Sequence, residues 1–297
     1  MFSGIAIRAR AHPRAHGRCG VIFEDGRFVD GMIVCQFSCG AASAVATKIT
    51  LARHGHEKTR IVNAYVEEED KDNRRFLADC EKWFDHEIVV VRNEKYNASA
   101  REVWRRERYI KGPNGASCSL RLKREPISKY MQSIGWSFEC GDRMVIGFVV
   151  DEKNQERIER GRDAGWLLPC VDLNLTHADC RGMVMRAGIR LPDRYMVQGF
   201  ENANCIACCK GGERYFRRER RIHPADVDEV VQIQKAIGPS AYFFRNKETG
   251  ERYTPAEIPD DGPVTEADAP ECSFFCAMAE EDYGEPTPRQ QPGGGAR

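Results

Sequence analysis

Short apolar runs alternate with longer amphipathic segments along the first two thirds of the chain, and this alternation constrains the fold most strongly. The runs of strand length are 32–37, 60–69, 87–93 and 143–150. Between and after them, apolar residues recur with helical spacing in 42–55, 72–84, 99–109, 127–136, 151–161 and 177–188. Buried strands separated by helices predict an α/β fold with a doubly wound, mostly parallel sheet.

The pattern changes near Gly199, which predicts a division of the chain. A cysteine-rich turn, an amphipathic helix over 224–238 and a hairpin over 241–255 follow there. The last residues are rich in Pro, Gly and charge and cannot form a core. We therefore expect four parts: an N-terminal extension with a short hairpin around 23–28 (1–30), an α/β nucleotide-binding domain (31–200), a small cysteine-rich helix and hairpin module (201–280) and a disordered tail (281–297).

The composition limits the class of partner and the compartment. The 297 residues include 45 Lys and Arg and 45 Asp and Glu, so no overall charge attracts nucleic acid or a membrane. We find no apolar run of membrane-spanning length and no signal peptide pattern, so we expect no membrane partner. The 13 cysteines then indicate reduced thiols, metal ligands or catalytic groups in a cytoplasmic protein.

The first strand-to-helix turn, "FSCGAAS", has the composition of an anion-binding loop. Small residues expose backbone N–H groups at a helix start, where the helix dipole also favours an anion. The turn lacks the Gly-Lys-Ser/Thr of a Walker A loop and the three spaced glycines of a dinucleotide fingerprint. Ser38, Gly40 and Ser43 suit a pyrophosphate, although close packing alone also explains small residues here.

The loop "FSCGAASAV" resembles the Ser-Gly-Gly-x-Asp/Ala-Ser loop of the adenine nucleotide alpha-hydrolase (PP-loop ATP pyrophosphatase) superfamily, in its phosphoadenosine phosphosulfate (PAPS) reductase-like branch. Further similar segments follow in order: "YVEEEDKDNRRFLADCEKWF", "GPNGASCSLRLKREP", "VIGFVVDEKNQERIER", "NCIACCKGG" and "ECSFFC". The resemblance covers roughly residues 31–280. It implies ATP with Mg²⁺ across the carboxyl ends of the strands, its phosphates held by Ser38, Cys39, Gly40, Ala41, Ala42 and Ser43.

Two residues depart from the family loop. Cys39 replaces one of its glycines, and Ala42 stands where some branches carry an acidic residue. Without that carboxylate, the loop itself is a poor ligand for Mg²⁺. An acidic run after the second strand could replace this carboxylate: Glu67, Glu68, Glu69 and Asp70. The equally weighted alternative is that this run is a solvated loop.

Paired cysteines in two separated segments indicate a tetrahedral sulfur site, because each turn supplies two thiolates. Cys205, Cys208 and Cys209 form one group, and Cys272 and Cys276 form the other. Zinc and a [4Fe-4S] cluster both fit this spacing. The resemblance to cluster-bearing relatives favours [4Fe-4S] on Cys205, Cys208, Cys272 and Cys276, with Cys209 as the spare.

Cys118 and Lys123 are the candidate catalytic residues. Cys118 occupies a family position near the nucleotide, and the neighbouring basic residues Arg121, Lys123 and Arg124 would favour its thiolate. It could act as a sulfur carrier, serve as a fourth cluster ligand, or be an inert loop cysteine. The remaining cysteines in apolar or helical contexts are expected to pack in the core: Cys35, Cys80, Cys140, Cys170 and Cys180.

A basic run follows the cysteine turn and predicts a nucleic-acid or nucleotide partner. It combines aromatic Tyr215 and Phe216 with five arginines, Arg214, Arg217, Arg218, Arg220 and Arg221. Guanidinium groups bind phosphates, and aromatic rings stack on bases. A solvated helix face is the stronger alternative for such a mixed run. A second run is equally ambiguous: Arg101, Arg105, Arg106 and Arg108.

Three functions agree with these features. In the first, the enzyme cleaves ATP to AMP and pyrophosphate, adenylates an acceptor such as nucleic acid, and supports sulfur transfer from a donor protein through the cysteine site. In the second, it is a sulfonucleotide (PAPS) reductase that releases sulfite. Only Glu271 and Cys272 of the family's Glu-Cys-Gly-x-His motif are present, so the reductase ranks behind the first function. In the third, the chain is a catalytically inactive nucleotide- or nucleic-acid-binding module.

Overall fold

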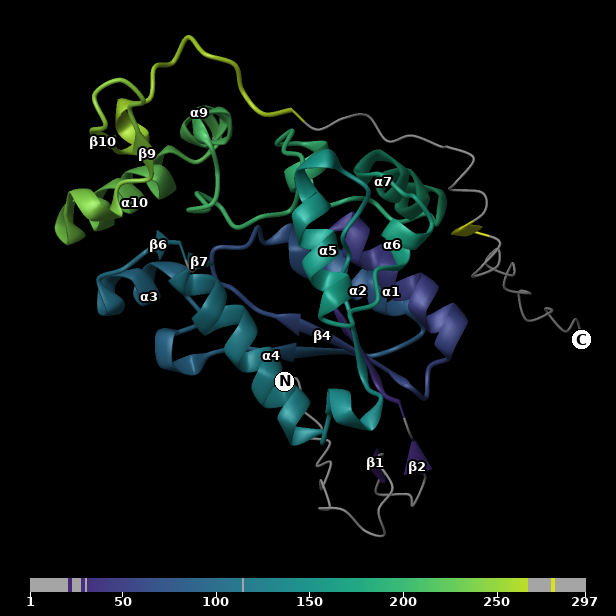
Figure 1. Ribbon diagram of the computed structural model, residues 1–297. Helices are drawn as coiled ribbons and strands as arrows, with labels where there is room; N and C mark the ends of the chain where they lie inside the picture. Colours follow the sequence, from purple (N-terminus) through teal and green to yellow (C-terminus); the bar gives the residue numbers. More distant parts are fainter. Residues whose placement is uncertain (1–20, 23–27, 30, 114, 267–278, 281–297) are drawn as a thin grey trace, which may run out of the picture.

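A four-stranded parallel sheet forms the centre of the molecule (Figure 1). The computed structural model describes residues 21–22, 28–29, 31–113, 115–266 and 279–280. The strand order is β5–β4–β3–β8, with bounds Ile88–Val91, Thr59–Ala64, Ile33–Gln36 and Arg143–Val145. All three neighbouring pairs are parallel. The α/β fold predicted from the alternating pattern is therefore confirmed.

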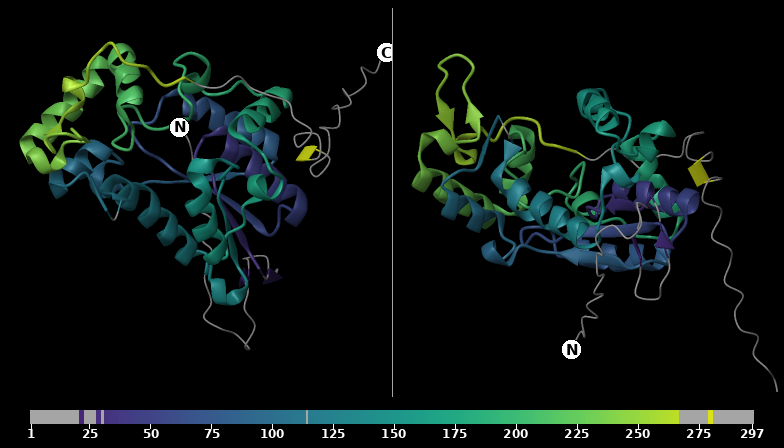
Figure 2. Two further views of the ribbon diagram at one scale, coloured as in Figure 1. Left: turned by 45° about the horizontal axis from the view of Figure 1, so that its top comes forward. Right: turned by 60° about the horizontal axis from the view of Figure 1, so that its bottom comes forward.

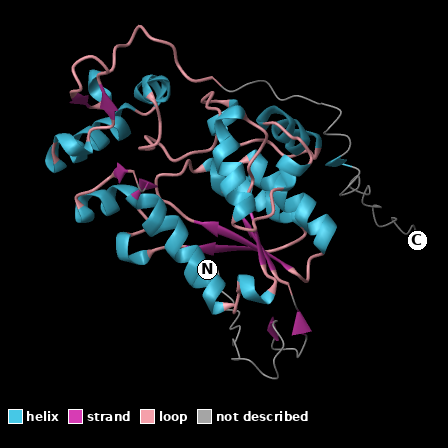
Figure 3. Ribbon diagram, viewed as in Figure 1, coloured by secondary structure: helices cyan, strands magenta, loops and turns pink. Residues whose placement is uncertain are grey.

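Helices cover both faces of this sheet. Side chains alternate between the two faces of a strand, so the residues of β3 contribute to two separate cores. Ile33 and Cys35 belong to one apolar core, while Met32 and Val34 belong to another. The first core includes residues of α1 (Ala41–His54), α2 (Asp72–Phe84), α6 (Pro169–Asp172) and α7 (His177–Arg186). The second core includes residues of α4 (Glu125–Ser133), which lies across the other face (Figure 3).

Strand β8 is shorter than the sequence predicts. The apolar run 143–150 was expected to be a strand throughout, yet the sheet pairing ends at Val145. One isolated parallel bridge joins Val145 to Leu167 on the far side. Residues 146–150 leave the sheet here and pass beside the start of α1, where Gly147 contacts Ser43.

A third apolar core lies at one end of the molecule and joins segments far apart in the sequence. It unites residues of α3 (Ala100–Glu107) with residues of α9 (Glu213–Ile222) and α10 (Pro224–Ile237). Figure 2 shows α9 and α10 beside the α3 region in both orientations. Their packing brings the cysteine turn at 205–209 against residues 116–122.

The remaining elements are short, and their ends follow the expected capping rules. Thr176 caps α7 and forms a capping box with Asp179, as its position predicts. Gly55 ends α1 with φ 81°. The predicted hairpins are present as antiparallel pairs, β1 (Val21–Ile22) with β2 (Phe28–Val29) and β9 (Phe244–Arg245) with β10 (Arg252–Tyr253). Other elements are η1 (Glu94–Tyr96), β6 (Lys111–Gly112), β7 (Gly115–Ala116), the π-helical η2 (Ser119–Arg124), η3 (Phe138–Cys140), η4 (Glu152–Asn154), α5 (Gln155–Asp163), α8 (Asp193–Met196), η5 (Pro239–Ala241) and η6 (Pro255–Glu257).

Several expectations concern residues that fall outside these ranges. The expected tail, 281–297, and the second cysteine group, Cys272 and Cys276, both lie outside the described residues, and the proposed domain boundaries stay a prediction. Within the described ranges, no helix combines the length and apolar character needed to cross a membrane.

Candidate functional site

A large cavity lies where the strand order of the sheet reverses. Strand β3 pairs with β4 on one side and with β8 on the other, so the connections leaving β3 and β8 diverge. Open parallel sheets bind ligands in the crevice at such a point. The cavity has a volume of 1150 Å³, and residues following β3, including Ser38, and residues following β8, including Gly147, both line it.

The loop between β3 and α1 is held by its two serine side chains. Ser43 Oγ accepts a hydrogen bond from the backbone N–H of Ser38 at 3.1 Å and donates one to the Gly40 carbonyl at 2.9 Å. Ser38 Oγ lies 3.1 Å from Ser43 Oγ. Both serines line the cavity. Of the six loop residues predicted to bind phosphate, Ser38 and Ser43 line the cavity, whereas Cys39, Gly40, Ala41 and Ala42 lie between them in the chain and are not among its lining residues.

Cys39 adopts a left-handed backbone conformation, with φ 56°. Residues other than glycine rarely adopt this region, and such strain concentrates at functional loops. The left-handed conformation at position 39 explains why the family that the loop resembles has a glycine there, since glycine adopts this conformation without strain. Burial raises the pKa of the Cys39 thiol to about 12, and Glu69 adds to this effect, so this thiol is protonated and inert.

Gly147 and Tyr195 both lie close to the loop, Gly147 beside Ser43 and Tyr195 beside Gly40. A Cβ at Gly147 would lie 2.6 Å from the backbone N and Cα of Ser43, so only glycine fits. A Cβ at Gly40 would lie 3.3 Å from the hydroxyl of Tyr195. The loop conformation is thus fixed by residues distant in sequence.

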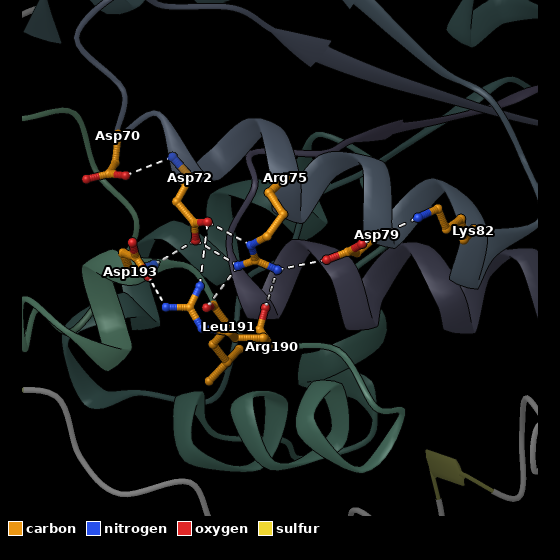
Figure 4. Close-up of polar contacts among 8 residues, drawn as sticks. All are labelled: Asp70, Asp72, Arg75, Asp79, Lys82, Arg190, Leu191 and Asp193. Carbon is orange, nitrogen blue, oxygen red and sulfur yellow. Dashed lines mark hydrogen bonds and ion pairs between the residues drawn. The ribbon is translucent and has the colours of Figure 1, made fainter.

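An ion-pair network attaches the segment carrying Tyr195 to α2 (Figure 4). Arg75 Nε lies 2.7 Å from Asp72, and its NH2 nitrogen donates to the Leu191 carbonyl at 3.1 Å. The backbone N–H of Asp193 donates to Asp72 at 3.0 Å and so joins the start of α8 to the start of α2. The guanidinium of Arg75 lowers the pKa of Asp72, which keeps the carboxylate charged. This network has a structural role in placing Tyr195 beside the loop.

Cationic side chains predominate in the large cavity. Its basic side chains are Lys123, Arg157, Arg181 and Lys210, and its acidic ones are Asp151 and Glu201. The first residues of α7, Thr176, His177 and Ala178, also line it, so two helix N-termini border the same space. Guanidinium groups, ammonium groups and helix N-termini all favour a polyphosphate. The arrangement can therefore hold several phosphate groups at once.

Sequence reasoning missed most of these cations. Arg157 belongs to α5, Arg181 to α7, and Lys210 follows the cysteine turn, so no local motif connects them. The available signal was positional, because Asp151 and Arg157 come soon after a predicted strand whose carboxyl end faces any ligand. Lys123 was expected and does line the cavity.

Glu69 is the member of the acidic run that lies near the loop. One carboxylate oxygen is 3.1 Å from Lys123 Nζ and the other is 2.9 Å from Arg74. The Glu69 side chain is only 3% exposed, whereas that of Lys123 is 40% exposed. Burial opposes the charge on Lys123, but Glu69 and the nearby thiols outweigh it and raise the Lys123 pKa above its usual value.

The other three acidic residues have separate roles. Glu68 is buried and accepts hydrogen bonds from the hydroxyl of Ser99 and the backbone N–H of Ala100, so it caps α3. Asp70 accepts from the backbone N–H of Asp72 and from Gln198. Glu67 accepts from the Tyr65 hydroxyl. The solvated-loop alternative is therefore wrong for Glu68 and Glu69, which are buried.

Cys118 and the turn at 205–209 meet, although they are far apart in sequence. Cys118 packs against the third apolar core, which includes Cys209, and the Cys209 thiol lowers the pKa of both Cys118 and Cys208. Cys205 packs against the same core, and the charges of Lys123, Cys208 and Cys118 influence its pKa. We call Cys118, Cys205, Cys208 and Cys209 the thiol cluster. Cys118 stands immediately before the π-helical stretch η2, and π-helical turns recur at functional sites. Cys118 is thus no isolated loop cysteine.

The thiols of this cluster differ in acidity. The hydrogen bond from Cys209 lowers the pKa of Cys208 to about 6, against the effect of burial, and the charges of Lys123 and Lys210 contribute. The same neighbour lowers the pKa of Cys118. Its two thiol neighbours raise the pKa of Cys209, and burial raises that of Cys205. Of these thiols, Cys208 is the one whose surroundings most favour the thiolate.

Of the four predicted cluster ligands, the structure brings Cys205 and Cys208 together, while Cys272 and Cys276 lie outside the described residues. Cys209, expected to be the spare, is buried in the third apolar core, and Cys118 and Cys208 raise its pKa. Among the residues that the structure describes, no three His, Cys, Asp or Glu side chains are arranged to hold a metal ion. The iron-sulfur cluster, the zinc alternative and a Mg²⁺ site stay predictions.

A buried polar network supports the cysteine turn. The Tyr215 hydroxyl donates to the Cys205 carbonyl at 2.7 Å and accepts from the Cys208 N–H at 3.1 Å. Glu219 accepts from the Ala207 N–H at 3.1 Å and pairs with Arg194 at 2.7 Å. The turn is thereby held from α9.

The arginines of α9 are engaged within the protein. Arg217 donates to the Pro259 carbonyl at 2.7 Å, and Arg218 donates to the Gln198 carbonyl at 3.0 Å. Arg214, Arg220 and Arg221 contact backbone carbonyls of Val264, Pro255, Ala256 and Asp260. The second basic run is similar, since Arg101, Arg105 and Arg108 contact α10. These contacts give both runs an intramolecular role and leave the nucleic-acid partner as a prediction.

The core assignment of the other cysteines holds with one exception. Cys35, Cys80, Cys170 and Cys180 are buried, whereas Cys140 is half-buried. Burial raises the pKa of Cys35 to about 12. Cys170 nevertheless touches the loop, because its thiol donates to the Ala42 carbonyl at 3.5 Å.

Compared with known protein families and with curated proteins, the chain matches none.

Proposed function

We propose that the protein is a PP-loop ATP pyrophosphatase that cleaves ATP to AMP and pyrophosphate, adenylates an acceptor and supports sulfur transfer. The observation that carries this proposal is the 1150 Å³ cavity at the reversal of strand order, with Ser38 and Ser43 on one wall and Lys123 and Lys210 on others. The resemblance to the adenine nucleotide alpha-hydrolase superfamily agrees with a nucleotide in this position.

The phosphate groups would lie between the loop and the basic side chains. The loop supplies hydroxyls and the N-terminus of α1, and α7 directs a second helix N-terminus to the same space. Attack of an acceptor oxygen on the α-phosphorus forms the new P–O bond and expels pyrophosphate. Fixed positive charge, as on Lys123 and Arg157, lowers the barrier by stabilising the charge that develops on the leaving group.

The thiol cluster would serve the second half-reaction. Adenylation turns an acceptor oxygen into a good leaving group, and a sulfur nucleophile then displaces AMP. Cys208 is suited to carry that sulfur as a persulfide received from a sulfur donor protein, because its surroundings lower its pKa and favour a thiolate. The outer sulfur attacks the acceptor carbon and expels AMP, and a second thiol of the cluster then forms a disulfide with Cys208 and releases the sulfur on the acceptor. Lys123 joins the two regions, since it lines the cavity and also interacts electrostatically with Cys205 and Cys208.

We derive no step through a metal, because the described residues include no group arranged to hold one. A [4Fe-4S] cluster or zinc would need Cys272 and Cys276, which lie outside those residues. The steps above assign roles to the loop, the cations and the thiols of the described residues.

The test is product analysis after incubation with Mg-ATP and nucleic-acid acceptors. AMP and pyrophosphate without ADP support the proposal, whereas ADP contradicts it. Lys123→Gln should greatly reduce AMP formation because it removes the charge shared by the cavity and the thiols. Lys129→Gln is the matched control. Lys129 is an exposed lysine of α4 that does not line the cavity, so this variant should leave the rate of AMP formation unchanged.

A second candidate, the sulfonucleotide reductase, is favoured by the thiolate of Cys208 beside Lys123. Such an enzyme would attack the sulfate sulfur of a sulfonucleotide with a cysteine and would release sulfite when a thiol donor reduces the product. The same assay with PAPS and a thiol donor distinguishes the two, because sulfite forms only in this case. If neither AMP nor sulfite forms, the result favours the third function, a nucleotide-binding module without catalysis.

A further inference from the structure

A second cavity, of 830 Å³, adjoins the first and has a different character. The two share Gln36, Lys123, Ile127 and Ile146, so they meet at the catalytic lysine. The second cavity extends under α4 and is lined by the aromatic rings of Trp136, Phe138 and Trp166, together with Met131 and Met144. None of these side chains has a role in the site described above.

The aromatic wall of this cavity is well ordered by its own contacts. The rings of Trp136 and Phe138 meet edge to face, with centroids 4.5 Å apart and planes at 71°. The Trp136 indole N–H donates to the Arg143 carbonyl at 3.3 Å, which fixes that ring against the start of β8. Phe138 is nevertheless 41% exposed. Exposed rings beside a reactive centre offer a stacking surface for a flat heterocycle.

The first cavity has room for the whole of ATP without this aromatic wall. Its 1150 Å³ exceeds the about 300–1,000 Å³ of most small-molecule sites. It also has its own aromatic residue, Phe148, whose ring lies 4.6 Å from the Arg157 guanidinium carbon. The second cavity therefore remains for the other reactant, which must reach the α-phosphorus beside Lys123.

We propose that this second cavity binds the nucleobase of the acceptor, an inference that rests on the proposed adenylation reaction. The base stacks against Phe138 and the two tryptophans, and its polar edge meets Ser128, Gln132 and Glu139, which also line the cavity. The reacting atom then points through the shared opening toward Lys123. The same chemistry suits a free nucleoside and a base in a single strand.

Intrinsic tryptophan fluorescence tests this proposal. The protein is saturated with α,β-methylene-ATP and titrated with the four nucleosides in one arm and short single-stranded oligonucleotides in the other. Binding of either probe should quench the emission while the ATP analogue stays bound. Quenching by nucleosides identifies a small acceptor, and quenching by oligonucleotides alone identifies a strand. Competition between probe and analogue, or binding of neither probe, overturns the proposal.

Variants assign the signal to the cavity. Phe138→Ala should weaken probe binding about fivefold or more, the loss expected when one base stack is removed. Tyr109→Ala is the matched control, because Tyr109 is 44% exposed and lines neither cavity. Trp136→Phe should keep binding but reduce the quenching. Equal affinity of Phe138→Ala and the parent protein would contradict the proposal.

The outcome stays separable from that of the proposed function. Probe binding that Phe138→Ala weakens, in a protein that forms no AMP, supports the nucleobase site and contradicts adenylation. AMP formation from ATP with a probe that competes with the nucleotide supports adenylation and contradicts the nucleobase site.

Discussion

Arg194 and Glu219 form a salt bridge of 2.7 Å in which both side chains are 0% exposed. The guanidinium carbon of Arg194 also lies 3.6 Å from the centroid of the Phe200 ring, and its NH2 nitrogen donates to the Tyr215 hydroxyl at 3.1 Å. Because Tyr215 and Glu219 bind the backbone of the cysteine turn, this buried pair supports the thiol cluster from behind.

Breaking this pair should therefore cost much stability. Glu219→Gln leaves the Arg194 charge buried without its counterion, and such a loss costs about 3–5 kcal/mol of unfolding free energy. Glu102→Gln removes the surface ion pairs of Glu102 with Arg105 and Arg106, while Arg105 keeps its pair with Glu229, and should cost less than about 1 kcal/mol. Urea denaturation of both variants measures the difference. Equal losses would mean that the buried pair contributes no more than a surface pair.

The loop should depend on the glycine that passes behind it. Gly147→Ala places a Cβ 2.6 Å from the Ser43 backbone and must displace the loop, whereas Gly212→Ala meets no atom within 4 Å. Since a misplacement of about 1 Å costs on the order of 100-fold in rate, we expect that loss of AMP formation for Gly147→Ala alone. Circular dichroism checks that both variants fold. An active Gly147→Ala enzyme would show that the loop does not hold the reacting phosphates.

The thiolate of Cys208 should be visible in its alkylation. Its rate of reaction with iodoacetamide in metal-free protein, followed by peptide mass spectrometry, should rise with pH and reach half its maximum near pH 6. A free cysteine derivative does so near about 8.5. Cys209→Ala removes the hydrogen bond that contributes most and should move the Cys208 midpoint upward. An unchanged midpoint in that variant would assign the shift to the lysines instead.

The same shift makes stability depend on pH. The pKa of Cys208 is lower in the folded chain than the ordinary thiol value of about 8.5, so folding favours its thiolate. The resulting stabilisation is complete above pH about 8.5 and disappears as the pH falls through about 6. Cys208→Ser should remove this part of the stability profile.

Local patterns predicted the elements well, because their signals are local. The sequence places a helix at 72–84, and α2 spans Asp72–Phe84 with its apolar side against the sheet. Thr176 was identified as a cap because the residue type and its position suffice. The loop at Ser38–Ser43 was likewise found from small residues between a strand and a helix.

The site itself could be predicted only in part, because it depends on packing between distant segments. Cys118 meets Cys209 only because the third apolar core brings η2 against the cysteine turn. The Arg217 side chain turns toward residues 259–263, which no periodicity in α9 indicates. Strand pairing and core contacts of this kind set which cations reach the cavity.

The predicted iron-sulfur cluster has a simple test. Protein purified without oxygen should be brown and absorb near about 400 nm if thiolates bind iron. Cys272→Ser with Cys276→Ser should abolish the colour, while Cys209→Ser should retain it if Cys209 is the spare thiol. A colourless protein with one zinc ion would make the site structural. Colour that survives in the double variant would show that Cys272 and Cys276 are not required as ligands.

The arginines of α9 provide a test of the nucleic-acid interface against a structural role. Arg217 is buried, and its guanidinium binds the Pro259 and Pro263 carbonyls and lies 2.9 Å from Glu213. Arg217→Gln leaves these groups unsatisfied and should cost about 1–3 kcal/mol of unfolding free energy. Arg221 is exposed and, within the described part of the chain, donates to the Asp260 carbonyl at 3.3 Å, so Arg221→Gln should stay within about 0.5 kcal/mol of the parent.

Oligonucleotide binding at several salt concentrations completes this comparison. A lysine or arginine that neutralises one phosphate contributes about one unit to the slope of log affinity against log salt. We expect Arg217→Gln to leave the slope unchanged while it lowers stability, because its contacts are within the protein. A stable Arg217→Gln variant with a slope reduced by about one would instead place nucleic acid on α9.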